Sequence, residues 1–157
     1  MSTTHTASLP VTIRRRRPTK RLTLVVGLLA ALAVLGVSCT KNGAAFESAS
    51  RANGERHSRG LRDLWLDQTL INKAQAWAEH MAAAGTVSHS VLTDGAGSDW
   101  RVLGENVGWA NSISQMNSLF MGSAAHRANI LNSRYTRIGT GVAEVGGRYF
   151  VVQVFAG

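Results

Sequence analysis

Three short clusters carry the side chains of this sequence that could bind a ligand or catalyse a reaction. They are Ser88–Ser90 around His89, Gly104–Asn106 around Glu105, and Ser123–Arg127 with His126. Each cluster sets one titratable side chain beside small residues, which leave room for solvent to reach it. Two histidines and one glutamate are also a common ligand set for catalytic zinc.

The position of His126 favours a neutral imidazole. Ser123 can cap a short helix that continues through Leu131, so that His126 occupies the third helical position. The positive end of the helix dipole disfavours an imidazolium there. A neutral imidazole is the form that a metal ligand or a general base requires.

The spacing alone leaves a simpler interpretation open. In it, His89 and His126 are structural hydrogen-bonding groups and Glu105 pairs with an arginine. Arg127 is expected to be a solvated helix residue rather than a partner of Glu105 or of a nearby carbonyl, and His80 to be a flank residue of its helix rather than a ligand. The sequence lacks the CxxC, HExxH, GxSxG and phosphate-loop motifs of other common sites.

Helix-capping residues and periodicity predict the elements that must position these clusters. The clearest helix runs over Asp67–Ala84, with Asp67 as the cap and Gly85 as the left-handed stop. Its apolar stripe recurs every three or four residues, at Leu70, Ala74, Trp77 and Met81. Three further helices are predicted over Glu47–Ser58, Ile113–Met121 (capped by Ser112) and Ser123–Leu131.

The C-terminal segment changes to a period of two. Ile138 to Glu144 alternates, Gly146-Gly147 supplies a tight turn, and Arg148–Phe155 returns as an apolar strand. A third short strand is expected near Val87. Helices followed by a small antiparallel sheet predict an α+β domain.

The first 38 residues are predicted to be a signal peptide. A basic run from Arg14 to Arg21 precedes Leu22–Val37, sixteen residues without a charge. That stretch is shorter than the roughly 20 residues of a spanning helix, although an uncut anchor is the alternative. Without its six basic residues, the chain keeps eleven basic and nine acidic residues, a net charge of +2. This balance gives no reason to expect nucleic-acid binding.

Cys39, the single cysteine, follows the apolar stretch directly. Leu35-Gly36-Val37-Ser38 before it is similar to a bacterial lipobox, in which the cysteine becomes the lipid-modified first residue. The alternative is plain secretion with a nearby cut. A lipid would tether the protein to the membrane surface. Residues 39–50 are expected to be a tether, and residues 51–157 the folded domain.

Several motifs occur in an order that a known family shares. They are Asn53–Arg56, Gly60–Leu64, the long helix, His89-Ser90, Gly104–Val107, Ser123–Leu131, Ile138–Ala143 and Tyr149–Phe155. Together they resemble the CAP superfamily (cysteine-rich secretory proteins, antigen 5, pathogenesis-related 1), also called SCP domains, and its short bacterial members most closely. The resemblance covers about two-thirds of the chain.

The resemblance implies an α-β-α sandwich with a small antiparallel sheet between helical layers, and a shallow cleft with two histidines and two acids. Carried over by motif, these are His89, Glu105 and His126; the second acid is absent, because Leu119–Ser123 holds no carboxylate. In some members the cleft holds a divalent metal, so His89, Glu105 and His126 are the metal-ligand candidates here. Asn106 is expected to hydrogen-bond backbone near the cleft, and Asn106 and Ser123 complete the predicted ligand-binding set.

Three functions remain open. The first is an extracellular binding module for a lipid, a glycan or a protein, with zinc or calcium as a candidate ion. The second is a hydrolase, in which zinc activates water or Ser123 or Ser90 acts as a nucleophile beside a histidine. The third is a structural domain of the cell envelope with a vestigial cleft. The sequence does not predict the oligomeric state.

Overall fold

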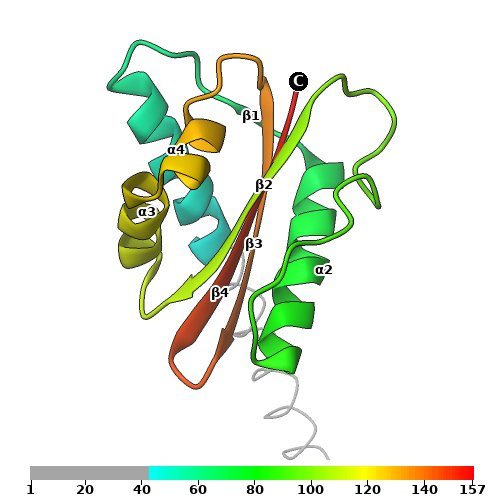
Figure 1. Cartoon of the computed structure of the whole chain (residues 1–157), viewed down its shortest axis with the longest axis vertical. Helices are drawn as coiled ribbons and strands as arrows, with labels where there is room; N and C mark the ends of the chain where they lie inside the picture. The colour runs from blue at the N-terminus through cyan, green and yellow to red at the C-terminus, as the bar shows by residue number, and fades with distance from the viewer. Residues whose placement is uncertain (1–42) are drawn as a thin grey trace, which may run out of the picture. The chain divides into compact units, whose positions relative to one another are not determined.

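The computed structural model describes residues 43–157, which belong to one compact unit. The predicted signal peptide, Cys39 and the start of the tether lie outside these residues. Residues 43–57 are helical. The labelled elements of Figure 1 follow in this order: β1 (Trp65–Leu66), α2 (Gln68–Ala84), β2 (Leu103–Ala110), α3 (Ile113–Gly122), α4 (Ala124–Ile130), β3 (Arg137–Val145) and β4 (Arg148–Ala156).

The four strands form one sheet between two helical layers. Their order is β1-β3-β4-β2, so that β2 is an edge strand. Helix α2 covers one face of the sheet, and the helix of residues 43–57, α3 and α4 cover the other (Figure 1). The predicted α+β sandwich is therefore confirmed. The sheet is mixed, because the short β1 runs parallel to β3 while the other pairs are antiparallel.

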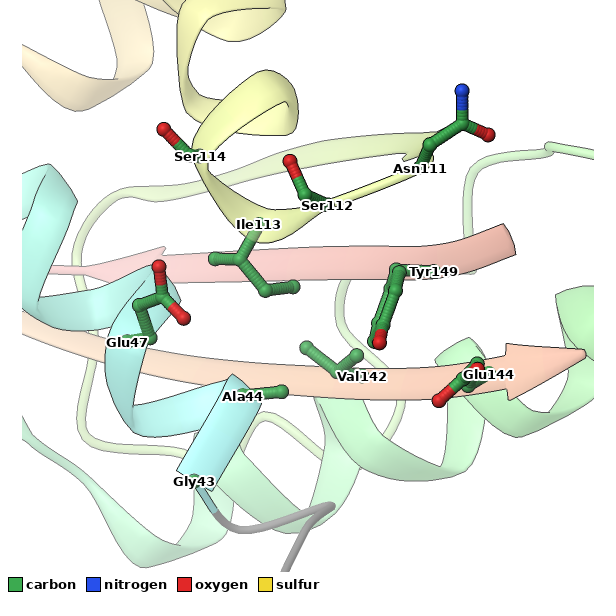
Figure 2. Close-up of a pocket in the computed structure, with 10 residues that line it drawn as sticks. All are labelled: Gly43, Ala44, Glu47, Asn111, Ser112, Ile113, Ser114, Val142, Glu144 and Tyr149. Atoms are coloured by element: carbon green, nitrogen blue, oxygen red, sulfur yellow. The ribbon is translucent and has the colours of Figure 1, made fainter. Parts of the chain in front are cut away.

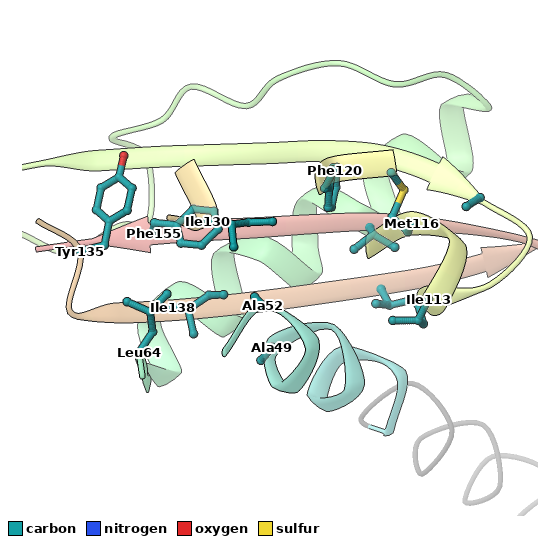
Figure 3. Packing of buried hydrophobic residues seen from close by; sticks show 13 residues of the cluster. Ala49, Ala52, Leu64, Ile113, Met116, Phe120, Ile130, Tyr135, Ile138 and Phe155 are labelled. Atoms are coloured by element: carbon teal, nitrogen blue, oxygen red, sulfur yellow. The ribbon is translucent and has the colours of Figure 1, made fainter. Parts of the chain in front are cut away.

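Alternate residues of β4 supply two hydrophobic cores. Val151 and Phe155 pack with Phe120 and other residues of the three-helix layer (Figure 3), whereas Val152 and its neighbours pack against α2. Because both faces are covered, β4 has an apolar sequence without strict alternation. Each β2 residue is paired with a β4 residue, and directly opposite side chains share a face. The two cores around β4 therefore show to which face each β2 side chain points.

Two pairs of glycines make local features of the fold possible. At Gly139 and Gly141 a Cβ atom would collide with the backbone of α2, so the missing side chains let this helix lie close on β3. Gly146 and Gly147 have φ values of 58° and 76° and form the predicted hairpin turn.

The capping predictions are largely confirmed. Asp67 accepts a hydrogen bond from the Leu70 N–H at the start of α2, and Gly85 ends the helix in the left-handed conformation. Ser112 caps α3 through the Gln115 N–H. Ser123 precedes α4, but its side chain makes no capping hydrogen bond.

Two predicted boundaries are wrong. Residues 43–50, expected to belong to a tether, are helical, because Ala49 and Ala52 pack into the core and extend the ordered helix forward. Val87 lies in no strand; the third long strand is β2, Leu103–Ala110. Within residues 43–157, every helix is too short or too polar to span a bilayer.

Candidate functional site

Glu105 and His89 form the centre of the candidate site. Glu105 lies on β2 opposite Val154, whose side chain belongs to the core under α2, so the carboxylate points to the α2 face. The Glu105 side chain is 3% exposed and the His89 side chain 63%. His89 Nδ1 lies 2.8 Å from Glu105 Oε1. An ionised carboxylate can only accept hydrogen bonds, so His89 Nδ1 carries the hydrogen and donates it to Glu105. In a neutral ring the lone pair is then on Nε2.

Ser90 donates two hydrogen bonds to the same carboxylate, and Lys73 in turn donates to Ser90. Ser90 donates its N–H to Oε1 at 3.0 Å and its hydroxyl to Oε2 at 2.6 Å. The Lys73 ammonium donates to Ser90 Oγ and to the Val91 carbonyl, both at 2.9 Å. Burial lowers the pKa of Lys73, and the charges of Glu105 and Asp94 offset this only in part.

Lys73 was missed by the sequence analysis. The signal that could have found it is a lysine on the apolar stripe of α2, three residues after Leu70 and four before Trp77. A charged residue at such a position needs a buried partner. Here that partner is the group formed by Ser90 and Glu105.

His126 lies on α4, which covers the face of the sheet opposite α2. It is the third residue of α4, and its ring packs edge-on against Phe120 with 5.1 Å between centroids. Burial lowers the pKa of His126, and the charge of His89 lowers it further. Glu105 supports the imidazole of His89 from the α2 face, whereas α4 carries the imidazole of His126.

Asn106 fixes the backbone of His126. Asn106 is fully buried, and its Nδ2 donates to the His126 carbonyl and to Gln153 Oε1, both at 3.1 Å. Asn129 donates to Asn106 Oδ1 at 2.9 Å, and Gln153 donates to Ser48 at 3.2 Å. The expected contact with backbone is present. Asn106 is buried in this structure, and its contact with a ligand stays a prediction.

Arg127 and Ser123 stay outside the hydrogen bonds of the carboxylate. Arg127 is exposed, as expected, but it also donates to the Met121 carbonyl at 2.9 Å, which is the alternative contact with a nearby carbonyl, and not to Glu105. Glu105 pairs with no arginine among the described residues; its partners are His89 and Ser90. Ser123 is half-buried, and its contact with a ligand stays a prediction.

The donor set does not fit a three-ligand metal centre. Within residues 43–157, no three or more His, Cys, Asp or Glu side chains are arranged to hold a metal ion. Both Glu105 oxygens already accept hydrogen bonds, which makes this residue the support of a histidine rather than a ligand. His89 and His126 remain the two imidazoles that could contact an ion.

His89 also borders a hollow of about 470 Å³ on α2. Trp77, His80, Ser90 and Val91 are among its lining residues, and Glu105 and His126 are not. The rings of Trp77 and His80 stack with 4.5 Å between centroids. His80 is an exposed residue of α2, as expected of a flank residue, and it borders the same hollow as His89.

A second hollow, of about 490 Å³, lies away from these residues. It is bordered by the start of the helix of residues 43–57, the start of α3 and the β3–β4 hairpin (Figure 2). Ile113 and Val142 form apolar parts of its wall, and Glu47, Glu144 and Tyr149 contribute polar atoms.

Comparison with known proteins gives relatives from bacteria. The protein YkwD of Bacillus subtilis, which is described as uncharacterized, is 32% identical over 103 residues, or 60% of this chain and 40% of that protein. The chain thus corresponds to less than half of this relative's length.

Solved structures share the fold. An extracellular SCP-domain protein from Bacillus anthracis superposes with a TM-score of 0.66 at 24% identity, covering 74% of this chain and 41% of that one. An outer surface protein from Borrelia burgdorferi superposes with a TM-score of 0.63 at 16% identity, covering 69% and 87%. The family model described as the cysteine-rich secretory protein family, CAP, matches residues 49–155. This match spans more than half of the chain, which therefore belongs to the CAP family.

Proposed function

We propose that this protein acts outside the cytosol as a binding module whose ligand contacts His89 and His126. The observation that carries the proposal is the support of His89 by Glu105. A buried carboxylate on Nδ1 fixes the orientation of the ring and leaves the exposed Nε2 as an acceptor. Burial lowers the pKa of His126 and so favours the neutral form of its ring.

The contacts favour binding over hydrolysis. The serine-hydrolase alternative needs a histidine that accepts the proton of the nucleophilic serine. Ser90 instead donates its proton to Glu105 and accepts from Lys73, and no histidine contacts its hydroxyl among the described residues. Catalytic zinc sites use three protein ligands, and the arrangement here offers two imidazoles. We therefore derive no reaction at this site.

Divalent zinc is a suitable probe of the two imidazoles, because both nitrogens must be free and near each other to share one ion. Zinc is titrated calorimetrically into the full-length protein in detergent and into His89→Ala and His126→Ala. We expect each variant to bind at least about tenfold more weakly, a loss of about 1.4 kcal/mol. His57→Ala is the matched control, since His57 is an exposed histidine of another helix.

Equal zinc affinity in wild type, His89→Ala and His126→Ala would contradict a shared imidazole site. Hydrolysis of peptide, ester or glycan substrates that disappears in His126→Ala would instead establish the enzymatic alternative.

We also propose that the chain is exported and anchored through Cys39. The basic run, the apolar stretch and the lipobox-like residues support this, and two similar structures come from proteins described as extracellular or outer surface proteins. The mass of the mature N-terminus tests it. An acylated Cys39 at the first position is the expected result, and Cys39→Ser should release the protein into the medium. An unmodified or absent Cys39 would exclude the anchor.

A further inference from the structure

The outer edge of β2 is open at one end only. Val102 and Gly157 exchange both backbone hydrogen bonds at 3.1 Å, which sets the register of this edge. Bonding then alternates along an antiparallel pair. The N–H and C=O groups of Leu103, Glu105, Val107 and Trp109 consequently point away from β4, toward the free edge of the sheet.

Side chains cover the first half of this edge. The Tyr135 hydroxyl donates to the Leu103 carbonyl at 3.2 Å, and Asn129 Nδ2 donates to the Glu105 carbonyl at 3.1 Å. No such contact reaches Val107, which is 6% exposed, or Trp109, which is 45% exposed, from elsewhere in residues 43–157. Two N–H donors and two carbonyl acceptors therefore lie in line, spaced as an incoming strand requires.

The open groups lie next to the candidate binding site. His89 is held on the α2 face of β2 by Glu105, and the backbone of His126 is held on the opposite face by Asn106. The side chain of Trp109 is also available, since the residue is 45% exposed with Arg148 over its ring. Figure 1 shows β2 passing in front of β4, on the side of the sheet opposite to β1.

We infer that the ligand of this site is an extended polypeptide segment, which adds as a strand to β2 at Val107 and Trp109. This inference rests on the proposed binding function and names the class of its ligand. A partner segment of three residues satisfies all four open backbone groups. The two residues opposite Val107 and Trp109 then direct their side chains to the α2 face, where His89 lies, and the residue between them directs its side chain to the face that α4 covers.

A matched pair of variants tests the backbone contact. Trp109→Pro removes the outward N–H, which an edge strand tolerates, and Trp109→Ala removes the same side chain but keeps the N–H. Binders are selected from a library of random seven-residue peptides against the full-length protein. We expect Trp109→Pro to bind a selected peptide at least about tenfold more weakly than Trp109→Ala does.

Amide hydrogen exchange gives a second measurement that does not depend on a variant. A bound peptide should protect the amides of Val107 and Trp109 in the wild-type protein. The amide of Gly108 already bonds to β4 and should change little.

Failure to select any peptide, equal binding by the two Trp109 variants, or protection elsewhere would overturn the inference. Dimerisation of the wild type that is lost in Trp109→Pro would assign the edge to a second copy and overturn it as well. Zinc titration of the wild type and of His89→Ala separates the two proposals. Zinc binding without peptide binding rejects the strand addition alone, whereas loss of the imidazole dependence rejects the binding site itself.

Discussion

At the scale of single residues, the buried carboxylate of Glu105 decides how the exposed imidazole of His89 is presented. Three donors reach this carboxylate: the ring of His89 and the N–H and hydroxyl of Ser90. A carboxylate accepts all of them, whereas an amide offers one acceptor atom and two unwanted N–H groups. The charge of Glu105 is therefore required for the arrangement as well as its shape.

Glu105→Gln should lower the free energy of unfolding by about 2 kcal/mol, because at least one buried donor loses its partner. Urea denaturation measures this loss, and nitrogen chemical shifts of His89 should show that Nδ1–H no longer dominates. The control is Glu144→Gln, which changes an exposed carboxylate. Equal losses in the two variants would show that the contacts of Glu105 contribute nothing specific.

His126 makes stability depend on pH. Burial and the His89 charge lower its pKa in the fold, so the unfolded chain takes up this proton at a higher pH than the folded one. Its contribution to stability is therefore complete above the ordinary histidine pKa of about 6.5 and is lost as the pH falls through the lowered value. The free energy of unfolding, measured with urea, should fall less between about pH 7.5 and about pH 5 in His126→Gln than in wild type. An identical decline would contradict the shifted pKa.

At the scale of elements, Asp67 joins the start of α2 to the sheet. Its carboxylate caps the Leu70 N–H at 3.0 Å and pairs with Arg137 of β3 at 2.8 Å. Asp67→Ala should cost about 1 to 2 kcal/mol in thermal or urea unfolding, because the cap and the pairing are lost together. Asp99→Ala removes the other, 74% exposed partner of Arg137 and should cost less than about 0.5 kcal/mol. Similar costs for both variants would argue against the cap.

Replacing two glycines with alanine should change the stability in opposite directions, through close packing at Gly139 and through helix propensity at Gly54. Gly139→Ala places a methyl group against the backbone of Leu70 and Ile71, and we expect it to lower the free energy of unfolding by about 1 to 3 kcal/mol. Gly54→Ala adds the same methyl group in open space within a helix, where it should stabilise by about 0.5 to 1 kcal/mol. Denaturation of the two variants beside wild type measures both signs. A neutral Gly139→Ala would show that α2 does not need this close approach.

The elements that could be predicted from sequence are those with local signals. Asp67 and Gly85 mark the ends of α2, and Gly146-Gly147 marks the hairpin, because caps and tight turns depend on a few neighbouring residues. Strand β2 has no such signal. It carries two glycines and a buried Glu-Asn pair, and both of its faces are covered, so no alternation shows in its sequence.

The candidate site was predictable in its residue types but not in its contacts. The motifs pointed to His89, Glu105 and His126. The contacts of Glu105 with His89 and of Lys73 with Ser90 depend on the tertiary fold. The packing of α2 on the sheet brings Lys73 and the segment of His89 and Ser90 beside β2. The burial of Asn106 likewise follows from the tertiary fold, since Gln153 and Asn129 reach it from distant parts of the chain.

At the scale of the whole molecule, the edge position of β2 explains how two helical layers can share one site. A sheet separates the layers on its two faces by roughly 10 Å each, so side chains from opposite layers meet only beyond an edge strand. We propose that His89, next to α2, and His126, on α4, meet in this way at β2. The proposed binding site depends on the convergence of these two imidazoles.

The pKa of His126, followed by NMR in wild type and in His89→Gln, tests this claim most directly. If the two rings share a site, the pKa of His126 rises when His89 is replaced, because the burial effect remains while the repelling charge is gone. His57→Gln, which removes an exposed imidazole of another helix, should leave the pKa of His126 unchanged. A His126 pKa that is the same in wild type and in His89→Gln would show that the imidazoles do not meet.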